Sequence, residues 1–75
     1  MNSADRRLTN EEERELRREL AELGQQHRDL DVAIAAMVAL PNPDTIRIQR
    51  LKKRKLALKD RIAALEDRLL PDIIA

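Results

Sequence analysis

The 75-residue sequence contains no cysteine and no aromatic residue, and it has only one glycine and one histidine. Without cysteine, disulfide bonds and thiol catalysis are excluded, and a single histidine excludes the usual structural zinc sites. Domains rich in strands normally use aromatic side chains and glycine turns, so a sheet protein is not expected. The chain is short enough to form at most one domain with a modest core.

Long hydrophobic runs are also missing. The longest weakly polar stretch covers residues 32–40, whereas about 20 apolar residues are needed for a helix that spans a membrane. The N-terminus has charged residues in place of the hydrophobic core of a signal peptide. The sequence therefore predicts a cytoplasmic protein that does not bind or cross a membrane.

The residues that are present favour long helices. Hydrophobic residues make up 43% of the chain, and most of them are Leu, Ile, Ala and Val, mixed with Glu, Arg and Lys as in helical proteins. Thr9 and Asn10 precede a glutamate run, with Glu12 and Glu13 three residues after each. Either pair fits a capping box at the start of a helix.

Prolines divide the chain into segments. Pro41 and Pro43 interrupt the helical pattern, Asp44 is a suitable N-cap for a second helix, and Pro71 ends it. We therefore expect one helical hairpin over residues 9–70, between a disordered N-terminus and an apolar tail. The expected ranges are 1–8 for the N-terminus, 10–40 and 45–70 for the helices, 41–44 for the turn and 71–75 for the tail.

Both predicted helices carry a heptad seam, in which core residues recur at alternating steps of three and four. The seam residues are Leu16, Leu20, Leu23, His27, Leu30, Ile34 and Met37 in the first helix, and Ile48, Leu51, Lys55, Leu58, Ile62, Leu65 and Leu69 in the second. A short turn makes the helices antiparallel neighbours, and all seven pairs then meet in one register, from Met37 opposite Ile48 to Leu16 opposite Leu69. The sequence predicts an all-α antiparallel coiled-coil hairpin.

The charged residues that flank the seams agree with this register. They predict three ion pairs between the helices: Arg17 with Glu66, Asp31 with Lys52, and Glu19 with Arg68.

Apolar residues also occur outside the seams, where a hairpin alone would leave them exposed. They include Val32, Val38, Leu40, Leu56 and Leu70. Such surface usually marks a contact, and two helices bury little by themselves. We expect a homo-oligomer, most simply a dimer that forms a four-helix or larger bundle. The alternative is that these residues only broaden the core of the hairpin.

The net charge of +1 conceals an asymmetry between the two halves of the chain. Residues 1–40 have six cationic and nine acidic residues, whereas residues 41–75 have nine and five. The positive charge gathers in the second helix, at Arg47, Arg50, Lys52, Lys53, Arg54, Lys59 and Arg61, with the seam residue Lys55 among them. An acidic protein surface, a nucleic acid or only solvent could meet this basic face. Without aromatic residues to stack on bases, binding to nucleic acid would depend on phosphate contacts and on salt.

Two polar residues occupy seam positions. His27 has Asp31 one turn further on, which suggests a register-setting residue or half of a metal site shared between two copies. We favour the structural role for His27, and likewise for Lys55. No other residues suggest catalysis, so we expect a non-enzymatic protein without cofactor, metal or small-molecule substrate.

Three segments of the sequence are distinctive: HRDLD at 27–31, the run LKKRKLALKD at 51–60 and the ending PDIIA at 71–75. In these segments the sequence resembles the YdcH-like family of small bacterial proteins, and the similarity covers about residues 15–75. The ending is similar to the alphaproteobacterial form. The run at 51–60 matches the family's LKK-x-KL-x-LKD hallmark at each position. The resemblance implies a bacterial cytoplasmic helical hairpin of unassigned function, with no catalytic residues to transfer.

Taken together, these features predict a self-associating interaction or adaptor module with an unidentified protein partner. The alternative is a small DNA- or RNA-binding protein that uses the basic face of its second helix. The tail residues Ile73 and Ile74 either pack back on the hairpin or bind a partner.

Overall fold

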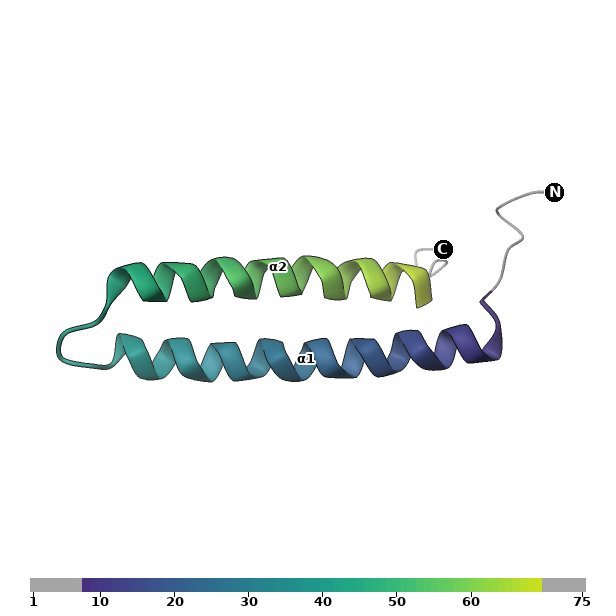
Figure 1. Cartoon of the computed structure of the whole chain (residues 1–75), viewed down its shortest axis with the longest axis horizontal. Coiled ribbons are helices and arrows are strands. Elements are labelled where there is room, and N and C mark those ends of the chain that lie inside the picture. The colour runs from purple at the N-terminus through teal and green to yellow at the C-terminus, as the bar shows by residue number, and fades with distance from the viewer. Residues whose placement is uncertain (1–7, 70–75) are drawn as a thin grey trace, which may run out of the picture.

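The computed structural model describes residues 8–69, which form two helices joined by a short turn (Figure 1). Helix α1 comprises Asn10–Val38 and helix α2 comprises Thr45–Leu69, and they lie side by side along their lengths. The predicted all-α helical hairpin is confirmed, while its assembly into a larger bundle stays a prediction. The expected N-terminal segment up to residue 7, Leu70 and the tail 71–75 lie outside the described residues.

Helix α1 begins with a complete capping box. The Thr9 hydroxyl accepts a hydrogen bond from the Glu12 backbone N–H at 3.0 Å, and the Glu12 carboxylate accepts one from the Thr9 N–H at 2.9 Å. Of the two boxes compatible with the sequence, the structure thus forms the one that starts at Thr9. Acidic residues in the first turn also complement the positive end of the helix dipole.

Replacing Thr9 with alanine is therefore expected to lower the free energy of unfolding by about 1 kcal/mol, because an N–H in the first turn loses its partner. Asn10→Ala serves as the control, since Asn10 is the first helical residue and not the cap. Urea denaturation followed by circular dichroism measures both variants. An equal loss in the two would contradict the assignment of the cap.

The end of α1 is set by proline. The helix ends at Val38, earlier than the sequence suggested, and the Leu40 N–H donates to the Met37 carbonyl at 3.2 Å in a tighter final turn. Pro41 explains this end, because proline disfavours helical backbone in the residue before it.

Helix α2 begins at the cap expected from the sequence. The Asp44 carboxylate accepts a hydrogen bond from the Arg47 backbone N–H at 3.1 Å, and the Asp44 carbonyl accepts from Ile48 at 3.0 Å. The carboxylate is the one acidic group close to the start of a helix whose first turn contains no acidic residue. Asp44 thus offsets part of the cost of placing arginine there.

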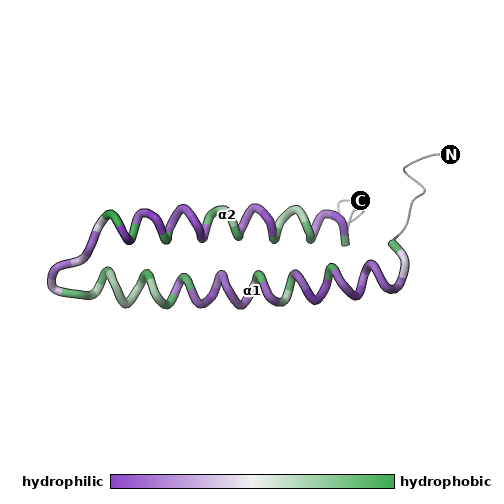
Figure 2. Tube along the Cα trace, viewed as in Figure 1, coloured by the Kyte–Doolittle hydropathy of each residue, from purple (hydrophilic) through white to green (hydrophobic). Residues whose placement is uncertain are grey.

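The core is a single layer of side chains between the helices. Hydrophobic residues recur along both helices between hydrophilic ones, as the heptad pattern requires (Figure 2). All fourteen seam residues are buried or half-buried, but only Ile34, Ile48 and Leu65 are less than a tenth exposed. Leu65, at 1%, is the most enclosed of these three. The remaining seam residues keep part of their surface in contact with solvent.

Candidate interaction surface

The ion pairs of the hairpin differ from those that the register suggested. Asp31 pairs with Lys55 at 2.6 Å rather than with Lys52, and Glu19 pairs with Arg61 at 2.9 Å rather than with Arg68. Arg17 binds Glu13 within α1 at 2.8 Å and forms no pair with Glu66.

Alternative partners explain these differences. Glu19 lies on the flank of the seam, where Arg61 and Arg68 are two turns apart on the facing helix, and it binds the former. Arg17 has an acidic neighbour one turn earlier in its own helix, a spacing that favours an ion pair. Each pair is exposed and contributes little to stability.

A polar cluster surrounds the seam lysine. The Nζ of Lys55 donates to one carboxylate oxygen of Asp31 at 2.6 Å, and the other oxygen lies 3.8 Å from Nδ1 of His27. The hydrogen bond from Lys55 is the main reason that the pKa of Asp31 is lowered. Desolvation beside the seam opposes this shift, and the charges of Lys55 and His27 support it. His27 and Lys55 thus direct their polar atoms toward the Asp31 carboxylate at the edge of the core.

This lowered pKa predicts a dependence of stability on pH. The carboxyl of Asp31 titrates at a lower pH in the folded state than in the unfolded chain. Its contribution is therefore present above about pH 4 and is lost as the pH falls through the folded-state value. Asp31→Asn should remove this part of the acid sensitivity, measured as the difference in melting temperature between pH 7 and pH 3.

Asp29→Asn provides the matched control for this experiment. Asp29 is also exposed, but its carboxylate accepts from Gln25 of the same helix at 2.9 Å. Its substitution leaves the contact between the helices intact. If Asp31→Asn melted with the acid sensitivity of the unsubstituted protein, the Lys55 contact would not stabilise the hairpin.

Most of the predicted basic face is not neutralised within the described part of the chain. Lys55 pairs with Asp31 and Arg61 with Glu19. The other cations are exposed and form no ion pair among residues 8–69; they are Arg47, Arg50, Lys52, Lys53, Arg54 and Lys59. The facing segment of α1 explains this, because its two carboxylates at Asp29 and Asp31 already accept hydrogen bonds.

The apolar residues outside the seams are exposed, which contradicts the alternative that they broaden the core. The exposed fractions are 70% for Val32, 53% for Val38, 54% for Leu40 and 58% for Leu56. Leu70 lies outside the described residues.

Ile46, which is 65% exposed, belongs to the same surface and was not predicted. It lies two residues before the seam position Ile48, so the heptad spacing already placed it outside the core. That spacing is the signal that could have identified it.

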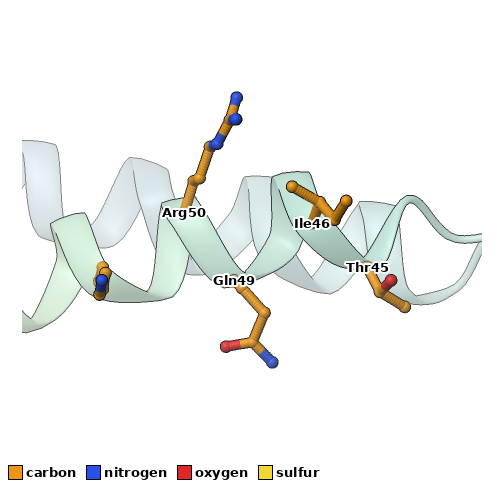
Figure 3. A pocket seen from close by; sticks show the side chains of 5 residues that line it. Thr45, Ile46, Gln49 and Arg50 are labelled. Atoms are coloured by element: carbon orange, nitrogen blue, oxygen red, sulfur yellow. The ribbon is translucent and has the colours of Figure 1, made fainter.

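A shallow, open hollow lies on the outer side of α2 near the turn. It has a volume of about 510 Å³ and is lined by Thr45, Ile46, Gln49, Arg50 and Lys53 (Figure 3). Ile46 and Arg50 project to one side of the helix and Gln49 to the other. The hollow thus joins an exposed apolar side chain to two members of the basic face.

Other kinds of site have little support among residues 8–69. No three potential metal ligands converge there, and His27 and Asp31 are only a pair. Neither helix of the described part has the length and apolar character required to span a membrane.

Comparison with known proteins identifies the hairpin but not its role. Residues 20–66 match the family model described as Protein of unknown function (DUF465). The matched region contains the turn and most of both seams. No curated protein matches the chain, and neither does any solved structure.

Proposed function

The chain belongs to the DUF465 family of unknown function, and we propose that it is a non-enzymatic interaction module that self-associates and binds another macromolecule through its turn end. One observation carries this proposal. Five large apolar side chains are more than half exposed, whereas only three of residues 8–69 are less than a tenth exposed. Apolar surface of this extent usually marks a contact.

Self-association is supported by the thinness of the core. Eleven of the fourteen seam residues are only half-buried, and a single pair of helices offers no second layer to cover them. A second hairpin would supply this layer and would form a four-helix bundle, in which facing helices share one core. We therefore favour a dimer.

The partner is expected to be an acidic protein surface with apolar side chains. Lys52, Lys53 and Arg54 supply positive charge, while Val38 and Leu40 supply apolar contact at the turn. Salt screens charges but does not weaken hydrophobic contacts, so the apolar part of this protein interface should persist as salt rises. Binding to a nucleic acid through its phosphates would instead weaken steeply with salt.

The proposal also includes the finer family assignment. The basic run at residues 51–60 supports a YdcH-like protein of the alphaproteobacterial form, and with it a bacterial cytoplasmic location.

A pull-down from bacterial lysate at near-physiological salt tests this function, with the full chain as bait and with or without nuclease. Lys53→Glu with Arg54→Glu should abolish capture of the partner protein. Arg14→Glu with Arg18→Glu is the matched control, because both arginines are exposed and form no ion pair among residues 8–69. This control should retain the partner.

The outcomes of this experiment separate the possible roles. One protein that is captured with and without nuclease, and lost only with the α2 substitutions, supports an adaptor. Recovery of nucleic acid that disappears with nuclease and with rising salt would overturn the proposal in favour of a polyanion-binding protein. Recovery of the chain alone would leave only self-association.

A further inference from the structure

The hollow on α2 has a defined chemical preference. Ile46 offers apolar surface that is 65% exposed, while Arg50 and Lys53 line the same hollow and form no ion pair among residues 8–69. A segment that fills it therefore needs an apolar side chain beside Ile46 and an acidic group beside the two cations. Figure 3 shows that this surface faces outward from the helix and away from α1.

The C-terminal segment 70–75 of this protein has that composition. It contains three large apolar residues, Leu70, Ile73 and Ile74, with Asp72 between them and no cation. We propose that the segment 70–75 of a second copy binds the hollow lined by Ile46, Arg50 and Lys53. This inference rests on the self-association proposed above and specifies its orientation.

The segment cannot reach the hollow of its own chain. Ile46 and Leu69 lie 23 residues apart in α2, which corresponds to about 35 Å at the helical rise per residue. The five residues from Leu70 to Ile74 span at most about 18 Å when fully extended. The occupant must therefore come from another molecule.

The distribution of charge favours the required arrangement. Residues 27–58, which form the turn half, carry seven cations and three carboxylates, a net charge of +4. Residues 8–26 and 59–69, which form the open half, carry six cations and nine carboxylates, a net charge of −3. Two hairpins whose turns point in opposite directions would place each positive half beside a negative one.

The antiparallel pair of hairpins is a closed, symmetric assembly. Each molecule contributes one hollow and one C-terminal segment, so a two-fold axis satisfies both and limits the assembly to two copies.

Disulfide trapping tests the proposal in the full chain, which has no cysteine of its own. Gln49→Cys places a thiol at the hollow and Ala75→Cys places one on the segment. Mixed under mild oxidation, the two variants should form a heterodimer, because a disulfide requires Cα atoms within about 7 Å. Gln49→Cys alone should not crosslink, since the two turns lie at opposite ends of the dimer.

Each outcome is decisive when sedimentation is measured alongside. Efficient crosslinking of Gln49→Cys with itself would show parallel hairpins and overturn the inference. A dimer without a mixed disulfide would overturn the inference but leave self-association intact. A monomer at micromolar concentration would overturn both.

A pair of exposed apolar residues gives an independent measurement. Ile46→Ser should raise the dissociation constant of the dimer at least tenfold, while Ala57→Ser should change it less than twofold. Ala57 is a suitable control because it is exposed on the same helix and does not line the hollow. Neither side chain is in the core, so both variants should fold. Equal weakening by the two would contradict a specific role for the hollow.

Discussion

Leu65→Ala is expected to lower the free energy of unfolding by about 2–5 kcal/mol and to leave much of the protein unfolded at 25 °C. Leu65 is only 1% exposed and is the most enclosed side chain among residues 8–69. Its truncation would remove apolar contacts with α1 and leave a cavity in a core that has only one layer. Urea denaturation followed by circular dichroism measures the loss.

Leu56→Ala is the matched control for this prediction. It makes the same chemical change in the same helix, but at a side chain that is 58% exposed. Substitutions on the surface usually change stability by less than about 0.5 kcal/mol. Both variants should be measured at one low protein concentration, so that self-association does not contribute. Similar losses would mean that the two helices do not pack through the predicted seam.

Lys55→Leu is expected to stabilise the hairpin by about 1–2 kcal/mol, because it places an apolar side chain at a half-buried seam position. The side chain of Lys55 is 36% exposed and its amine reaches Asp31 at the edge of the core. Loss of that exposed ion pair costs little, because solvent screens the attraction between exposed charges. Because polar seam residues restrict register and oligomer number, the variant should also form a broader range of oligomers.

Lys59→Leu separates the effect of the seam from that of lost charge. Lys59 is exposed, lies outside the seam and forms no ion pair among residues 8–69. Its substitution should leave the melting temperature nearly unchanged. Thermal melts and sedimentation velocity compare the two variants. A lower melting temperature for Lys55→Leu would show that the contact with Asp31 outweighs apolar burial.

The burial of the seam residues was predictable because their pattern is redundant. Seven pairs agree on one alignment from Met37 and Ile48 to Leu16 and Leu69, and a shift would expose the whole seam. The caps at Thr9 and Asp44 were predictable because each cap hydrogen bond joins residues only three positions apart in the sequence.

The ion pairs were predicted wrongly because flanking side chains are long and have more than one partner within reach. Two arginines that lie two turns apart on the facing helix are possible partners for Glu19, and spacing alone does not choose between Arg61 and Arg68. Arg17 likewise binds Glu13 of its own helix. Such choices depend on side-chain conformation, which periodicity does not determine.

The candidate surface was predictable only in part. Counting charges located the basic face, and the heptad spacing identified Val32, Val38, Leu40 and Leu56 as residues outside the core. The hollow was not predicted, because it lies between side chains of one helix and depends on the directions in which they project. The sequence does not determine those directions. The occupant proposed for the hollow belongs to a second molecule, so no motif within one chain reveals it.

Sedimentation equilibrium of the full chain at micromolar concentration tests the central claim most directly. A hairpin that covers its exposed apolar residues by self-association should give the mass of at least two chains of 8.7 kDa each. The mass should fall toward that of one chain on dilution, together with the melting temperature. A mass of one chain, with a cooperative thermal transition, would contradict the account, because the hairpin would then be stable with its apolar surface uncovered.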